Sequence, residues 1–254
     1  MYFVGLDLAW SVNNQSGIAI VDSDGTLMHV DAKLHEDDII DSLTPFVCGD
    51  CIVAIDGPLI VTNATGQRPA ERALNVDFGR FEAGAHSANT RIFAAGLRGA
   101  RIADALGLDM NPNSGAPRRA IEVYPHPATI SLFRLGRTLK YKKGDAAVRR
   151  AELLRLMELI EGLADASPSL RVTGLPAWIE LHSKVTAATR PFQLDKAEDP
   201  VDAVLCAHIA MYAHHRPDDV TVYGDFDTGY IVTPTLPPGS VTDETDIRAR
   251  LRRT

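Results

Sequence analysis

The chain has little of several features that mark particular classes of protein. It contains three cysteines in 254 residues, too few for a disulfide framework. Aromatic residues make up 6% of the sequence, so it shows no obvious platform for stacking single-stranded bases. No uninterrupted apolar run approaches the roughly 18 residues of a membrane span. These shortages argue against a disulfide-stapled miniprotein and against a helical membrane protein.

Positive charge is also scarce. The 26 Lys and Arg residues are outnumbered by 33 Asp and Glu residues, which gives a net charge of -7. Broad, sequence-independent adhesion to nucleic acid needs a basic surface and is therefore disfavoured. The N-terminus lacks the basic segment and small-residue cleavage site of a secretory signal, so we expect a cytoplasmic protein without a membrane partner.

Three familiar catalytic or redox motifs are missing or out of context. The sequence has no Gly-x-x-x-x-Gly-Lys phosphate loop and no Gly-x-Ser-x-Gly nucleophile elbow. Cys48 and Cys51 have the spacing of a redox pair, but Cys51 begins the apolar run 51–55, which predicts a strand rather than a helix. Because no second pair exists, a zinc site or redox chemistry is a weak alternative.

The composition, 45% hydrophobic and 23% charged, is that of an ordinary globular protein. Its first 58 residues predict three strands, a helix and a fourth strand, with Asp24 and Gly25 as a hairpin turn between the second and third strands. The predicted strands are 2–9, 17–22, 27–32 and 51–55, and the predicted helix is 35–47. This order begins as an antiparallel meander and ends with a crossover to a parallel strand.

The pattern then loosens over residues 59–119, which we interpret as a helical insertion. The later part returns to strands and helices. The predicted helices are 69–78, 91–106, 128–135, 145–164, 177–188 and 199–215, and the predicted strands are 120–124, 220–223 and 230–233. We therefore predict one α/β domain over residues 1–234 and a C-terminal tail over residues 235–254.

Carboxylates stand where the predicted strands end. Asp7 lies inside the first strand between the small residues Gly5 and Ala9, and a buried carboxylate needs a cation, hydrogen bonds or a metal. Asp56 ends another strand, and Glu122 lies within a third. Since ligands in open α/β sheets gather at strand ends, these acids could converge with a helical acid, Asp202, on a divalent cation.

Simpler interpretations exist for several of these residues. Asp199 could be the N-cap of a helix whose first residue is Pro200, and Asp202 would then add charge to the first turn. Asp56 could be a turn residue before Gly57 and Pro58. His126, between two prolines, is either a base or ligand or an ordinary turn residue. Asp7 is the acid for which a purely structural role, such as a cap or a turn, is the least satisfactory explanation.

The acids lie in four short motifs, which together resemble an ordered set known in one family. The motifs are Gly5-Leu6-Asp7-Leu8-Ala9-Trp10, Ala54-Ile55-Asp56-Gly57-Pro58, Glu122-Val123-Tyr124-Pro125 and Asp199-Pro200-Val201-Asp202-Ala203. The chain resembles, over residues 1–234, the Domain of Unknown Function 429 family, whose members are described as predicted nucleases of the RNase H fold. Residues 68–72 and 141–142 also resemble positions that the family tends to keep.

The resemblance implies a ribonuclease H-like mixed sheet, with a three-stranded antiparallel meander, parallel strands and helices on both faces. It implies an acid cluster that binds Mg²⁺ or Mn²⁺, with ions about 4 Å apart where two are bound. The implied metal ligands are Asp7, Asp56, Glu122, Asp199 and Asp202, of which Asp7, Asp56, Glu122 and Asp202 are the implied catalytic residues. Glu122 does not match the acid on the first helix of RNase H itself, and Asp199 competes with Asp202 for one position.

The implied substrate is nucleic acid or a nucleotide, with Arg68, Arg72 and Lys142 as candidate substrate-binding residues. The basic run 134–150 could contact phosphate groups, or it could be a solvated loop and helix face. The leading prediction is thus a metal-dependent nuclease or phosphodiester hydrolase. The alternatives are a phosphotransferase of the same fold superfamily and a non-catalytic binding protein.

Overall fold

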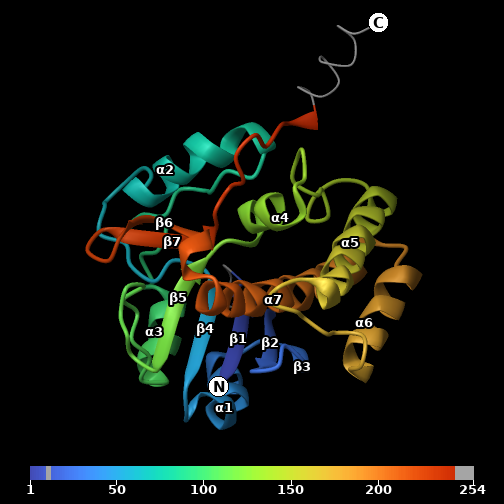
Figure 1. Ribbon diagram of the computed structural model, residues 1–254, viewed down its shortest axis with the longest axis horizontal. Coiled ribbons are helices and arrows are strands. Elements are labelled where there is room, and N and C mark those ends of the chain that lie inside the picture. The colour runs from blue at the N-terminus through green and yellow to red at the C-terminus, as the bar shows by residue number, and fades with distance from the viewer. Residues whose placement is uncertain (10–12, 244–254) are drawn as a thin grey trace, which may run out of the picture.

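The computed structural model describes residues 1–9 and 13–243. Within them the chain forms a mixed α/β structure around one seven-stranded sheet in the order β3-β2-β1-β4-β5-β7-β6 (Figure 1). Trp10 of the first motif and residues 244–254 of the predicted tail lie outside the described residues. The strands are β1 Tyr2–Asp7, β2 Ser16–Asp22, β3 Leu27–Lys33, β4 Cys51–Asp56, β5 Arg118–Val123, β6 Val220–Asp225 and β7 Gly229–Pro234.

The predicted combination of a meander and parallel strands is confirmed. Strands β1, β2 and β3 pair antiparallel, while β4 pairs parallel with β1 and β5 parallel with β4. The predicted hairpin turn forms because Gly25 adopts a positive φ of 79° and the Asp22 carboxylate accepts hydrogen bonds from the backbone of Asp24 and Thr26. The β6–β7 hairpin extends the sheet through a parallel contact between Val123 and Val232.

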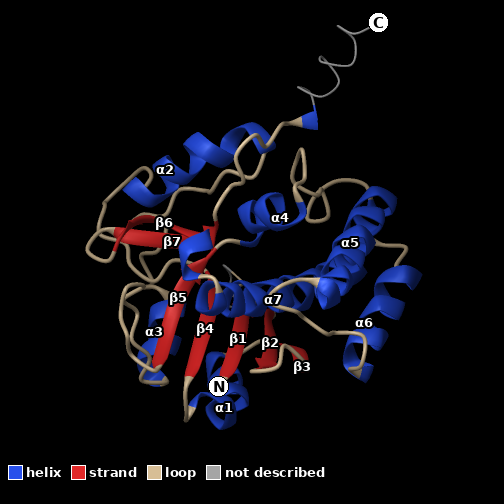
Figure 2. Cartoon of the chain, viewed as in Figure 1, coloured by secondary structure: helices blue, strands red, loops and turns tan. Residues whose placement is uncertain are grey.

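The α-helices within the described residues flank the sheet (Figure 2). They are α1 Glu36–Val47, α2 Pro69–Phe78, α3 Arg98–Ala105, α4 Pro125–Phe133, α5 Ala146–Glu161, α6 Pro176–Ala187 and α7 Pro191–His215. Four of them begin with proline, which lacks a backbone N–H and has a φ suited to the first helical turn. Among these helices none combines the length and the apolarity needed to cross a membrane.

The longest helix differs most from its prediction. We predicted it from residue 199, with Pro200 as its first residue, but α7 begins at Pro191 and Pro200 lies inside it. Asp199 is therefore not an N-cap. A proline usually marks a helix start because it has no N–H to donate to the preceding turn. Here two prolines, nine positions apart, are both compatible with the first position of the helix. The predicted helix 91–106 is also shorter, since α3 begins at Arg98.

Helices cover both faces of the sheet, and residue alternation decides which side chains each face presents. Helix α7 crosses one face over β1, β2 and β4 (Figure 1). On that face lie Gly5 and, two residues later, Asp7, because side chains alternate along a strand. The register aligns Asp7 with Asp56 on β4, so both carboxylates face α7. Helix α3 covers the other face, where Gly99 approaches the side chain of Ile55.

Gly5 allows α7 to lie directly on β1. A Cβ atom at this position would be 1.9 Å from the Ala203 carbonyl oxygen and 2.4 Å from the Ala207 backbone nitrogen. Both are backbone atoms of α7, so the helix would have to move. We expect Gly5→Ala to lower the free energy of unfolding by at least the roughly 1–3 kcal/mol typical of overpacking, measured by urea denaturation. Gly49→Ala, with open space around its Cβ, is the matched control; equal stability of the two variants would contradict this packing.

Candidate functional site

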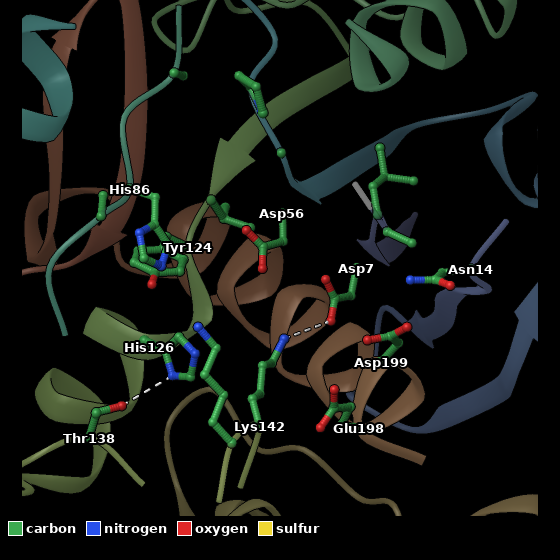
Figure 3. Close-up of a pocket in the computed structure, with 18 of the residues that line it drawn as sticks. Asp7, Asn14, Asp56, His86, Tyr124, His126, Thr138, Lys142, Glu198 and Asp199 are labelled. Carbon is green, nitrogen blue, oxygen red and sulfur yellow. Dashed lines mark hydrogen bonds and ion pairs between the residues drawn. The ribbon is translucent and has the colours of Figure 1, made fainter. Parts of the chain in front are cut away.

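Four of the acids predicted from the sequence, Asp7, Asp56, Glu122 and Asp199, border a pocket of about 1010 Å³, and Asp202 is not among its lining residues. Its floor includes the ends of β1 and β4, and its walls include the first half of α7, the segment 138–143 and the segment 82–88. Figure 3 shows Asp7, Asp56 and Asp199 arranged around the end of the Lys142 side chain.

Asp7 and Asp56 lie side by side at the ends of two parallel strands. They are register partners, and Asp7 is almost fully buried. Burial raises the pKa of Asp7 to about 6 against the attraction of Lys142, and Asp202 adds repulsion. Burial also raises the pKa of Asp56 well above its usual value, with repulsion from Asp7 as the next cause. These two carboxylates therefore gain from any additional positive charge in the pocket.

Helix α7 contributes further acids to the same space. Asp195, Glu198, Asp199 and Asp202 follow one another at intervals of three, one and three residues, which places them on one side of a helix. Burial followed by repulsion from Asp7 raises the pKa of Asp199 to about 9. Burial raises the pKa of Glu198 to about 7, although Lys142 opposes the rise. Asp202 is completely buried, and its Oδ1 accepts a hydrogen bond from Tyr141 at 2.7 Å.

Lys142 is the cation at the centre of these acids. Its Nζ is 2.7 Å from Asp202 Oδ2 and 3.4 Å from Asp7 Oδ2. Burial alone would lower the pKa of Lys142, but Asp202 and Asp7 raise it well above its usual value. The ammonium is therefore charged and neutralises part of the cluster. The candidate substrate-binding residue Lys142 thus lies inside the predicted metal site.

Glu122 does not join this cluster. The register aligns it with Ile55, one position out of phase with Asp56, so it lies on the opposite face of β5. Its carboxylate accepts hydrogen bonds from the Arg68 guanidinium through both oxygens, and from the Leu59 backbone at 2.9 Å. Glu122 is thus the partner of an internal arginine, whereas the sequence predicted a catalytic metal ligand.

Arg68 and Glu122 line the pocket, but the Arg68 guanidinium is engaged by groups of the protein itself. Its residue is 1% exposed, and its Nε donates to Glu71 Oε1 at 2.6 Å while Nη1 donates to the Ile60 carbonyl oxygen at 2.7 Å. Together Arg68, Glu71 and Glu122 form a buried charged triad that joins α2 to β5. Arg72 is exposed and donates to the Gln67 carbonyl oxygen, and it does not line the pocket.

The basic run 134–150 is mostly neutralised within the protein. Arg137 pairs with Glu152 and Asp243, and Lys140 pairs with Glu82. Arg149 reaches α7, where its Nη2 lies 2.6 Å from Asp195 Oδ1 and 3.1 Å from Glu198 Oε2. Because Arg149 Nε also donates to the Tyr141 carbonyl oxygen at 2.8 Å, it braces the loop that carries Lys142.

His126 lines the pocket near Lys142 (Figure 3). Its Nδ1 lies 3.1 Å from Thr138 Oγ1, which fixes the ring orientation. Burial, reinforced by the charge of Lys142, lowers the pKa of His126 to about 4. The imidazole is therefore neutral at pH 7. It can form a hydrogen bond with a bound molecule, but it offers that molecule no positive charge.

Glu198 is the acid that sequence reasoning missed. The signal was present, because Asp195, Glu198, Asp199 and Asp202 form an acidic stripe at helical spacing. It was hidden by the late start predicted for the helix, which left residues 191–198 outside it.

The cluster is not assembled as a metal cage. Among the described residues, no group of three or more His, Cys, Asp or Glu side chains has an arrangement that could hold an ion as it stands. Asp7 and Asp202 instead share the ammonium of Lys142. Cation binding at these acids therefore requires Lys142 or the carboxylates to move.

Comparison with known proteins identifies a family for nearly all of this structure. A family model described as "Protein of unknown function (DUF429)" matches residues 5–228, which include the end of β1 with Asp7, the acidic stripe of α7 and both motif-bearing strands between them. No curated protein and no solved structure gives a significant match. Since the match covers most of its length, the chain belongs to the DUF429 family.

Proposed function

We propose that the pocket binds one or two divalent cations, Mg²⁺ or Mn²⁺, and hydrolyses phosphodiesters. The observation that carries this proposal is the convergence of Asp7, Asp56 and Asp199, from two strands and a helix, on one pocket, with the buried Asp202 ion-paired to the same Lys142. Their only close cation among the described residues is Lys142. Such an excess of buried negative charge is costly unless a cation compensates it.

The donors suit the proposed ions in kind and in charge. They are carboxylate oxygens, which Mg²⁺ and Mn²⁺ prefer over softer ligands. Asp202 Oδ2 is buried and, among residues 1–9 and 13–243, finds no hydrogen-bond donor, so beyond its ion pair with Lys142 it keeps coordinating capacity. Burial, followed by repulsion between neighbouring carboxylates, raises the pKa values of Asp7, Asp56 and Asp199, and a divalent cation would oppose this rise by stabilising the charged carboxylates.

Each residue then has a distinct task. Asp7, central among the acids, and Asp56 and Asp202 beside it would hold the ions, which supply an activated water and neutralise the leaving oxygen. Lys142, displaced from the carboxylates, would bind a phosphate oxygen of the substrate. Neutral His126 would donate a hydrogen bond to the same phosphate. Tyr141 keeps Asp202 oriented through its hydroxyl group.

The topology supports this proposal. The order β3-β2-β1-β4-β5, with an antiparallel meander followed by parallel strands, is the arrangement that the resemblance to RNase H-like proteins implied. In that arrangement acids on the first strand, the fourth strand and a late helix meet, as Asp7, Asp56 and Asp202 do here. The fold by itself does not fix the reaction, so the proposal rests on the cluster.

Lys142 competes with the proposed ions, which leads to a specific expectation. Lys142→Gln removes the positive charge beside Asp7 and Asp202 and should tighten Mn²⁺ binding by about tenfold or more, since a unit charge at about 4 Å contributes several kcal/mol at an effective dielectric of 20. The same variant should turn over more slowly. Calorimetric titration measures the affinity, and Lys184→Gln, on the surface of α6, is the control. Weaker Mn²⁺ binding by Lys142→Gln would contradict the competition.

The experiment that tests the function is a hydrolysis assay. Wild type, freed of metal with a chelator, is incubated with Mn²⁺ or Mg²⁺ and with RNA, single-stranded DNA, duplex DNA and bis(p-nitrophenyl) phosphate. Metal-dependent cleavage of any of these diesters supports the proposal. Absence of cleavage of all four, in a protein that binds Mn²⁺, would refute it.

One observation favours a second function, that of a non-catalytic binding protein. Lys142 already neutralises part of the cluster, so the acids can be stable without an ion. This alternative predicts that millimolar Mn²⁺ gives no binding heat and no change in thermal stability. The two functions are therefore separated by metal binding before any substrate is identified.

A further inference from the structure

An aromatic side chain stands at the entrance of the acidic pocket with its ring in solvent. Phe192, in the first turn of α7, is 53% exposed and belongs to the pocket lining. No other ring among the described residues stacks against it, in contrast to Phe78, which packs against Tyr223. An exposed phenyl group at a pocket entrance is available to a ligand with a flat, apolar face.

Two ammonium groups border the same pocket without acidic partners. Lys143 and Lys196 are exposed, line the pocket and form no ion pair within the described part of the chain. Their neighbours Lys140 and Lys142 are both paired with carboxylates. The unpaired cations are therefore the ones that can compensate a negatively charged ligand.

The geometry of α7 relates these groups to the carboxylates. Phe192 and Lys196 are four residues apart and so lie on one side of the helix, and Asp199 follows within one further turn. At about 1.5 Å per residue, Phe192 and Asp199 are separated by about 10 Å along the helix. A short oligonucleotide can therefore contact the phenyl ring, the ammonium groups and the acidic floor at the same time.

We propose that the pocket entrance is a binding site for an unpaired nucleic-acid strand, in which one base stacks on Phe192 and flanking phosphates bind Lys143 and Lys196. Aromatic faces combined with cations are the usual elements of single-strand binding. A base within a duplex has both faces covered, so only an unstacked base can use Phe192. This inference rests on the proposed function, because it takes the pocket to be where a phosphodiester is cleaved.

The test measures binding without catalysis. Fluorescence anisotropy of fluorescein-labelled oligo(dT), in EDTA and at low salt, is recorded with wild type, Phe192→Ala and Phe192→Trp. We expect Phe192→Ala to weaken binding by about 5- to 150-fold and Phe192→Trp to retain it. Phe226→Ala is the matched control, since Phe226 is 42% exposed on the β6–β7 hairpin and does not line the pocket.

The salt dependence tests the cations. Lys196→Gln should reduce the slope of log affinity against log salt by about 0.7, the value for one phosphate contact to a single strand, whereas Lys184→Gln should leave it unchanged. Equal binding by Phe192→Ala and Phe226→Ala, or tighter binding of a duplex of the same length, would overturn the inference.

The outcome also separates the inference from the proposed function. Cleavage of diesters by a protein that binds no oligo(dT) leaves the hydrolase standing and overturns the strand-binding site. Binding that depends on Phe192, in a protein that cleaves nothing with Mn²⁺ or Mg²⁺, supports the strand-binding site and refutes the hydrolase.

Discussion

Arg68→Ala is expected to destabilise the protein by about 3–5 kcal/mol, the usual cost of removing one partner from a buried ion pair. The variant leaves Glu71 and Glu122 buried, each 1–4% exposed, without the guanidinium that compensates both. It also removes donors from the Ile60 carbonyl oxygen. Urea denaturation followed by circular dichroism measures the loss, which is large against the 5–15 kcal/mol of a typical domain.

Arg72→Ala is the matched control for this prediction. Arg72 lies in α2, one turn after Arg68, which caps the start of that helix, but Arg72 is exposed and its side chain donates a hydrogen bond to a backbone carbonyl. Its replacement should change stability by no more than about 0.5 kcal/mol. If Arg68→Ala were as stable as Arg72→Ala but bound oligonucleotides more weakly, Arg68 would be the substrate-binding residue that the sequence predicted, and its structural role would be refuted.

Asp7→Asn is expected to lower metal-dependent cleavage by at least about 10²–10³-fold while the fold persists. The amide has the shape of the carboxylate but not its charge, and the change relieves repulsion from Asp56 and Asp202. Loss of activity would thus come from loss of a metal ligand rather than from unfolding. Initial rates with saturating Mn²⁺ and the best substrate give the measurement, and circular dichroism checks the fold.

The control for Asp7→Asn is Asp104→Asn. Asp104 is an exposed residue of α3, outside the pocket, so its replacement should leave the rate within about twofold of wild type, as befits a surface change far from the site. Full activity in a folded Asp7→Asn would show that the cleavage, if present, is performed elsewhere.

The sheet could be predicted from the sequence because its signals are local. Strands β1, β2, β4, β5 and β7 are largely buried runs, and the Asp24–Gly25 turn joins β2 to β3 as expected. The order of β7 and β6 at the far edge had no such signal, because a parallel contact between β5 and β7 depends on residues more than a hundred positions apart. The start of α7 was wrong because Pro191 and Pro200 give the same local signal.

The site could be predicted only in part. Asp7, Asp56 and Asp202 meet because parallel register and an acid on a crossing helix bring them together. Glu122 was grouped with them because the sequence shows that it lies in a strand but not which face of the sheet it occupies. A one-residue difference in phase decides the face, and the burial of Arg68 beside Glu122 is visible only in three dimensions.

Lys142 shows why a residue's type alone does not establish its role. The basic run around it suggested contact with a phosphate backbone, yet most of its members pair with acids of the same chain. Phe192 and Lys196 lie before the predicted start of the last long helix, and the earlier start of α7 places them at the pocket entrance.

The measurement that tests the central claim most directly is calorimetric titration of Mn²⁺ into chelator-treated wild type and Asp7→Asn. If the acid cluster is a cation site, wild type binds Mn²⁺ with release of protons from its carboxyl groups, whose pKa values are raised to about 6 for Asp7 and about 9 for Asp199, and Asp7→Asn loses most of the affinity. Wild type that gives no binding heat at millimolar Mn²⁺ would contradict the claim and leave Lys142 as the cluster's permanent counter-ion.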